Sequence, residues 1–216
     1  MNYNTLKINK LTFYFTSVYI IGAILLVIIF YVGKKFNIPF ENLTGDPALT
    51  FKAHPFTGIL SNVGILLWCF TASVCFFSGT ILFNINDKNN GIFLICSGIF
   101  TSVLLIDDFF MFHDYIFYSF KNFTITQPFT YAIYLILSTW YIIKFHRIIL
   151  NNTYLFLVMS LGFLGLSASI DLIFESKGLE YFIEDGFKFI GIINWMLFFS
   201  ITAYQIVLKS KTKHVL

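Results

Sequence analysis

Three carboxylates and an imidazole occur together in an otherwise apolar stretch of the chain, residues 105–114 (LIDDFFMFHD). An ionisable side chain at the centre of a membrane-spanning segment costs about 2.5–3.5 kcal/mol, so such groups usually face a protein interior or a water-filled cavity. Asp107 and Asp108 are adjacent, and neighbouring carboxylates repel each other unless a cation, a proton or a basic side chain compensates. This segment therefore holds the strongest candidates for a functional site.

The spacing within this segment requires help from elsewhere in the chain. At about 100° per residue, Asp107 and Asp114 share one face of a helix, whereas Asp108 and His113 lie on either side of it. One continuous helix cannot direct all four side chains to a single point. If they form one site, we expect other helices to complete it, or the helix to unwind near Met111.

Two later segments supply suitable groups. Asp171 and Glu175 are four residues apart, on one face of a predicted helix, as are Glu184 and Lys188. Because successive membrane spans run in opposite directions, we expect these positions to lie within about two turns of the same membrane face as Asp107 and Asp108.

Such a cluster suits a divalent metal. Carboxylates with one imidazole favour Zn, Mn, Mg or Ca, and the bound metal would lower the pKa of a water molecule while a spare carboxylate acts as general base. The candidate metal ligands are Asp108, His113, Asp171 and Glu184, and the candidate catalytic residues are Asp107, Asp108, Asp171 and Lys188. The substrate of such an enzyme would be a lipid, a lipid-linked molecule or a membrane peptide.

Two further functions fit the same residues. Lys188 neutralising a carboxylate, with Glu184 and Asp185 complementing a helix dipole, would make the cluster a charge network that ties helix ends in a structural or assembly protein. Alternatively, the acids would bind a cation or proton in a transporter or sensor. The sequence leaves the enzymatic, structural and transport functions open.

Four motifs together resemble an uncharacterised group of small bacterial multi-span membrane proteins. They are residues 43–47 (LTGDP), 56–64 (FTGILSNVG), 107–114 (DDFFMFHD) and 184–188 (EDGFK). The last of these, with Phe109 and His113 as Phe-x-x-x-His, also resembles motifs of intramembrane metalloproteases of the PrsW and CAAX-protease-like type. There the acidic motif comes first and a further His motif follows. Here the order is reversed, the second acid is Asp185, and the last span has no histidine.

The elements that must position these residues are membrane-spanning helices. Hydrophobic residues make up 57% of the 216 residues and charged residues only 12%, and a span needs about 20 largely apolar residues. We predict an all-α, polytopic helical bundle in a lipid bilayer, with a single transmembrane domain over residues 1–216. The six predicted spans are 12–32, 58–83, 92–112, 128–146, 154–174 and 187–208. Gly162, Gly165, Ser167 and Ser169 give the fifth span a small surface suited to close packing.

Flanking charges predict the orientation. Lys and Arg resist translocation, whereas acids have little influence. Eight of the 14 basic residues flank one side, together with one of the 11 acids, Asp87: Lys7, Lys10, Lys88, Lys144, Arg147, Lys209, Lys211 and Lys213. We therefore expect both termini in the cytoplasm, with the acidic cluster and the loop 33–57 at the outer face of the cell membrane. The basic tail serves this topology, and no motif indicates a nucleic-acid partner.

Overall fold

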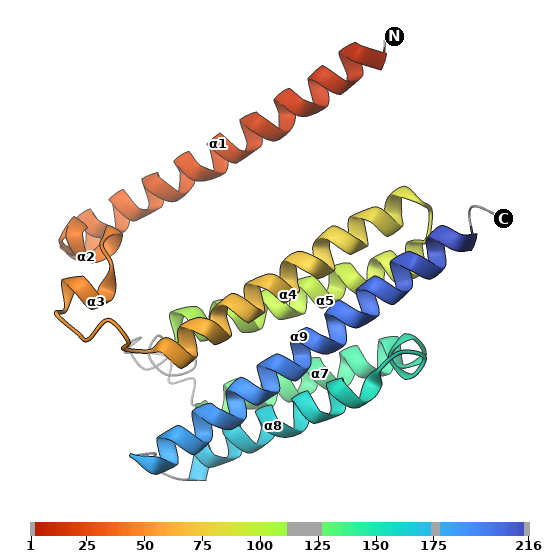
Figure 1. Cartoon of the computed structure of the whole chain (residues 1–216). Helices are drawn as coiled ribbons and strands as arrows, with labels where there is room; N and C mark the ends of the chain where they lie inside the picture. Colours follow the sequence, from red (N-terminus) through yellow and green to blue (C-terminus); the bar gives the residue numbers. More distant parts are fainter. Residues whose placement is uncertain (1–2, 112–126, 174–177, 214–216) are drawn as a thin grey trace. The chain divides into compact units, whose positions relative to one another are not determined.

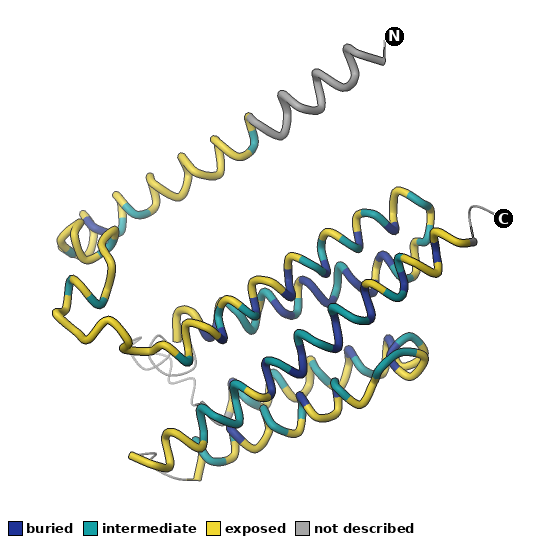
Figure 2. Tube along the Cα trace, viewed as in Figure 1, coloured by how far each residue is buried: buried dark blue, intermediate teal, exposed yellow. Residues whose placement is uncertain are grey.

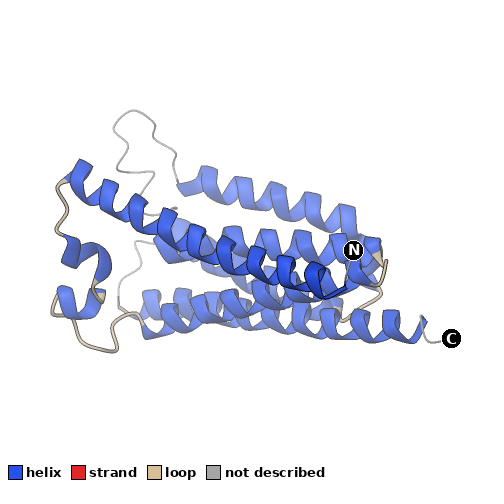
Figure 3. Ribbon diagram, turned by 90° about the horizontal axis from the view of Figure 1, so that it is seen from above, coloured by secondary structure: helices blue, strands red, loops and turns tan. Residues whose placement is uncertain are grey.

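The computed structural model describes residues 3–111, 127–173 and 178–213, and every regular element in these ranges is helical (Figures 1 and 3). The helices are α1 (Tyr3–Phe36), α2 (Phe40–Thr44), α3 (Pro47–Thr50), α4 (Ile59–Asn84), α5 (Lys88–Phe110), α7 (Gln127–Leu150), α8 (Tyr154–Ile173) and α9 (Leu179–Lys213). The predicted all-α fold class is confirmed.

Six of these helices are long and apolar enough to cross a membrane. The candidate spans are Thr16–Phe36, Ile59–Asn84, Lys88–Phe110, Phe129–Leu150, Tyr154–Ile173 and Leu179–Thr212. They correspond one to one with the six predicted spans and indicate a multi-pass membrane protein in a lipid bilayer. The largest difference is in α9, which begins at Leu179 because the polar residues Glu184 and Asp185 lie inside the helix instead of before it.

The chain divides into two compact units, Met1–Thr57 and Gly58–Leu216. In the first unit, the segment predicted as a loop folds back on the end of α1, where Phe40 stacks on Phe30 with ring centroids 5.7 Å apart. Asp46 caps α3 by accepting a hydrogen bond from the Leu49 N–H, with Pro47 at the first helical position. Asp46 and Pro47 therefore have a local structural role. The single domain over residues 1–216 stays a prediction.

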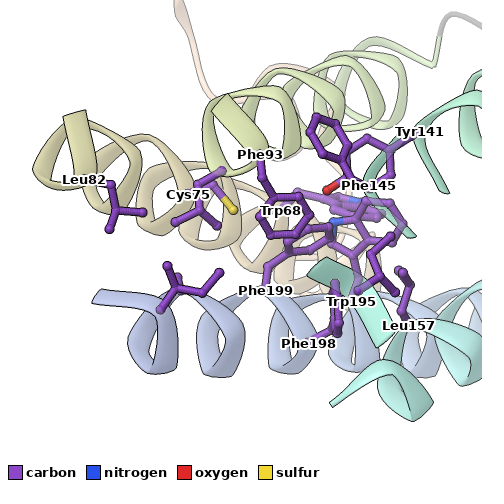
Figure 4. Packing of buried hydrophobic residues seen from close by; sticks show 14 of the residues in the cluster. Trp68, Cys75, Leu82, Phe93, Tyr141, Phe145, Leu157, Trp195, Phe198 and Phe199 are labelled. Carbon is purple, nitrogen blue, oxygen red and sulfur yellow. The ribbon is translucent and has the colours of Figure 1, made fainter. Parts of the chain in front are cut away.

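The second unit is a helical bundle. Helix α4 packs against both α5 and α9, α9 packs along α8, and α7 contacts α8. The buried core at the centre of the bundle is aromatic: Trp68 and Trp195 meet edge to face at 5.6 Å, and Phe93 contacts Tyr141 and Phe199 (Figure 4). Buried positions lie along the facing sides of α4, α5 and α9 (Figure 2).

Polar groups within this core pair across helices. Ser97 and Tyr141 share a hydrogen bond of 2.5 Å between their hydroxyl oxygens, and the Trp195 indole N–H donates to the Thr101 hydroxyl at 3.0 Å. Buried polar groups without such partners are costly, particularly where no water is present. These bonds therefore specify how α5 docks on α7 and α9.

Glycines permit the closest approaches between helices, but they are not the glycines that the sequence predicted for this role. A Cβ on Gly79 would lie 2.9 Å from the Ile95 side chain and 3.3 Å from the Gly91 carbonyl oxygen, so α4 and α5 nearly touch there. The predicted close-packing surface of the fifth span is wrong at Gly162 and Gly165, which are exposed; a Cβ added at either would have no neighbouring atom within 4 Å. Of the two predicted serines, Ser167 is buried and Ser169 is exposed. Ser160, one further buried serine of α8, donates to the Gly191 carbonyl of α9.

Candidate functional site

The ends of five helices meet at one end of the second unit. Helices α4, α7 and α9 begin there, and α5 and α8 end there, because successive helices of the bundle run in opposite directions (Figure 1). Helix α5 ends at Phe110, two residues after Asp108. Met111 adopts a left-handed conformation, with φ 50° and ψ 46°, and its N–H donates to the Asp107 carbonyl. His113 and Asp114 lie outside the described residues, so the expectation that one site gathers all four side chains stays a prediction.

Asp108 is the centre of the site. Only 8% of its side chain is exposed, and its Oδ1 accepts a hydrogen bond and ion pair from the Lys188 ammonium of α9. Its Oδ2 accepts a hydrogen bond of 3.2 Å from the Trp68 indole N–H of α4. Both carboxylate oxygens are therefore engaged, and three helices are joined through one side chain.

A second carboxylate lies beside this pair. Asp185, one turn before Lys188 on α9, lines a small cavity together with Asp108 and Lys188. The cavity measures about 20 Å³, and Ser61 of α4 contributes a hydroxyl to its wall. A polar cavity of that size holds about one water molecule. Two carboxylates and one ammonium thus face a space too small for a lipid headgroup or a peptide.

Tyrosines of α7 lie beside two further carboxylates. The Tyr131 hydroxyl donates to the Asp171 carboxylate of α8 at 2.5 Å. Tyr134 lies close enough to the Asp107 carboxylate of α5 for the two side chains to interact electrostatically. Asp107 and Asp171 therefore lie where α7 meets its neighbours.

The structure brings together some of the predicted site residues. Asp108 and Lys188 are in direct contact, Asp171 accepts a hydrogen bond from Tyr131, and Asp107 lies beside Tyr134 at the same end of the bundle. Glu184 is half-buried in the second turn of α9, so the predicted dipole-complementing position at the helix start belongs to Glu180 instead. His113, Asp114 and Glu175 lie outside the described residues.

The predicted metal set is not assembled within the described part of the chain. Those residues contain no group of three or more His, Cys, Asp and Glu side chains placed to hold a metal ion. Because His113 lies outside them, the set Asp108, His113, Asp171 and Glu184 stays a prediction. A metal at Asp108 would lie beside the Lys188 ammonium, whose positive charge opposes a second cation at the same carboxylate.

Sequence reasoning missed the aromatic partners. Trp68 has the sequence context of an ordinary aromatic residue of a span, yet it is buried and donates to Asp108, and Tyr131 and Tyr134 were not singled out. The available signal was chemical. Tyr and Trp carry the donors that carboxylates accept, and Tyr131 and Tyr134 stand one turn apart at the start of a span whose direction places them beside the acids.

Comparison with known proteins places the chain in a family. The model of a family described as Domain of unknown function (DUF8692) matches residues 18–202, which include all six candidate spans at least in part. No curated protein and no solved structure matches the chain.

Proposed function

This chain belongs to the DUF8692 family, and because the family description names no activity, we propose a function from the site itself: the cluster of Asp108, Asp185 and Lys188 binds a proton or a small cation within the membrane. The protein would then be a proton- or cation-dependent transporter or sensor. The observation that carries this proposal is that two carboxylates and one ammonium line a cavity of about 20 Å³.

The charge of the cluster supports the proposal. With both carboxylates ionised and Lys188 protonated, these three side chains carry one net negative charge; Asp108 is buried, and Asp185 and Lys188 are half-buried. A proton or cation beside the two carboxylates offsets their mutual repulsion, which is stronger in a partly buried site than in water. The size of the cavity favours an ion no larger than a water molecule.

The experiment is an acid-minus-base infrared difference spectrum of the protein in lipid nanodiscs, repeated with and without sodium and potassium. We expect a carboxylic acid C=O band in the native protein that is lost in Asp185→Asn. Glu180→Gln is the matched control, because Glu180 is an exposed acid of the same helix outside the cavity. If a cation binds instead of a proton, we expect sodium or potassium to shift the carboxylate bands of the native protein but not those of Asp185→Asn. A native spectrum with neither the C=O band nor a cation-dependent shift, or an Asp185→Asn spectrum that retains the native response, would overturn the proposal.

Ion flux separates a transporter from a sensor. Proteoliposomes containing native protein should move protons or alkali cations down an imposed gradient if the site lies on a pathway, and Asp185→Asn should reduce that flux. Binding without flux assigns the site to a sensor.

A structural charge network is the second candidate. It is favoured by the Tyr131–Asp171 bond and by the joining of α4, α5 and α9 through Asp108. Such a network predicts losses of stability in variants of these residues without any proton- or cation-linked infrared band.

A metal-dependent membrane enzyme acting on a lipid or membrane peptide is the third candidate. It is supported by the carboxylates at this end of the bundle and by the end of α5 at Phe110, shortly before His113. Elemental analysis of purified native protein, compared with the triple variant Asp107→Asn, Asp108→Asn and His113→Ala, tests it. A stoichiometric metal lost in the variant would place this candidate first, and a metal-free native protein after metal-replete growth would remove it.

For localisation, we propose the cell membrane with both termini in the cytoplasm and the acidic cluster at the outer face. The support is the excess of basic residues flanking the opposite end of the spans. Labelling of single cysteines introduced at Asn151 and Glu180, using a membrane-impermeant reagent on intact cells, tests this orientation. Labelling at position 151 but not at 180 would reverse it.

A further inference from the structure

A wide groove lies at the other end of the second unit, away from the acidic cluster. It is formed at the beginning of α5, the end of α7 and the end of α9, and measures about 910 Å³. Helix α7 packs on α8, and its core contacts with α5 run through side chains such as Tyr141 and Phe93, so the two helices leave space between them where these side chains end. The volume is that of a site for a small organic molecule or a lipid headgroup.

The lining of the groove combines cationic and apolar groups. Lys144 and Arg147 of α7 are both exposed and line it, next to Phe145 and Ile148 of the same helix and Ile92 of α5. The Lys144 ammonium lies 4.6 Å from the centroid of the Trp140 ring and 5.3 Å from that of Phe145, which holds the charge over an aromatic surface. A ligand that fits these walls carries negative charge and an apolar portion.

Among the described residues, one acid lines the groove, and its carboxylate already accepts hydrogen bonds. Asp87 accepts hydrogen bonds from the Asn90 side chain at 2.9 Å and from the Ser210 hydroxyl at 2.5 Å. It thereby ties α5 to α9 at the base of the groove. Asn86 and Asn89, which also line the groove, add amide donors that suit phosphate oxygens.

The depth of the groove in the membrane narrows the class of ligand further. Candidate spans end at Leu150 and begin at Lys88, so Lys144 and Arg147 lie within the last two turns of α7, at the depth where headgroups meet acyl chains. Arg binds phosphate through two parallel hydrogen bonds, and basic grooves between transmembrane helices suit anionic headgroups. We propose that this groove binds the phosphate headgroup of an anionic phospholipid, whose acyl chains lie against Phe145, Ile148 and Ile92.

The test is thermal unfolding of the delipidated protein in detergent, titrated with phosphatidylglycerol, with phosphatidylcholine or with inorganic phosphate. We expect phosphatidylglycerol to raise the melting temperature at lower concentration than phosphatidylcholine. The variant Lys144→Gln/Arg147→Gln should bind phosphatidylglycerol about thirtyfold more weakly, since each basic group near a headgroup strengthens binding roughly fivefold.

The control removes the same charge from the same end of the bundle. Lys88 and Lys209 are exposed and do not line the groove, so Lys88→Gln/Lys209→Gln should keep the native response. The charge-preserving variant Lys144→Arg/Arg147→Lys provides a second check if neutralisation prevents folding, and it should retain binding. Equal responses to the two lipids, or equal losses in the groove variant and the control, would overturn the proposal. A full response to inorganic phosphate alone would identify free phosphate as the ligand and reject the lipid.

Discussion

Removal of the Lys188 charge is the most informative perturbation of the acidic cluster. In Lys188→Met the aliphatic stem is kept but the ammonium is lost, and a carboxylate whose side chain is only 8% exposed is left without its ion partner. Breaking a buried pair from one side costs about 3–5 kcal/mol, because the remaining charge is desolvated. We expect Lys188→Met to lower the free energy of unfolding by that amount.

The converse change should cost less. In Asp108→Asn the remaining ammonium is 30% exposed and still has Asp185 beside the same cavity, so the loss is that of a charge-assisted hydrogen bond, about 1.5–3 kcal/mol. The double variant removes both charges together and leaves neither uncompensated. Its loss should be smaller than the sum of the single losses by about 2 kcal/mol.

The assay is reversible unfolding in mixed detergent micelles with increasing SDS, followed by far-ultraviolet circular dichroism on all four proteins. Glu180→Gln provides the control on the same helix and should stay within about 0.5 kcal/mol of native, as exposed substitutions usually do. The reasoning is refuted if Asp108→Asn costs more than Lys188→Met, or if the single losses add to within about 0.5 kcal/mol.

Three further predictions concern single contacts. Trp68→Phe keeps an aromatic ring against Trp195 but removes the N–H that donates to Asp108. In the same unfolding assay it should lower the free energy of unfolding by about 1.5 kcal/mol in the native protein and by much less in the Asp108→Asn background. Tyr131→Phe removes the donor to Asp171 and should cost about 1.5–3 kcal/mol; an equal cost in the Asp171→Asn background would show that the hydrogen bond contributes nothing. Gly79→Val forces side-chain atoms against Ile95 and the Gly91 carbonyl and should lower the free energy of unfolding by about 1–3 kcal/mol. Gly162→Ala meets open space and should leave that free energy unchanged or raise it by up to about 1 kcal/mol. The reverse order in thermal unfolding would contradict the described α4–α5 packing.

The sequence by itself determined the fold class and the number of spans. Apolar length and the placement of charges are local properties, and six stretches long enough to cross a bilayer can be read without knowing how they pack. Helical geometry also indicated that the four ionisable residues of 107–114 cannot face one point from a single continuous helix. The alternating direction of the spans predicted that Asp108 and Lys188 lie at the same membrane face. That direction did not specify which acid would pair with Lys188.

Only the tertiary structure decided the partners. Lys188 pairs with Asp108, 80 positions away in the sequence, and Tyr131 donates to Asp171, 40 positions away. Helix rotation and crossing angle determine which side chains meet. The same reason explains the glycines: Gly79 lies at a close crossing and Gly162 faces open space, although both stand among small residues in apolar spans. The groove beside Lys144 and Arg147 depends on the spacing of α5 and α7, a distance between helices that no local pattern of residues encodes.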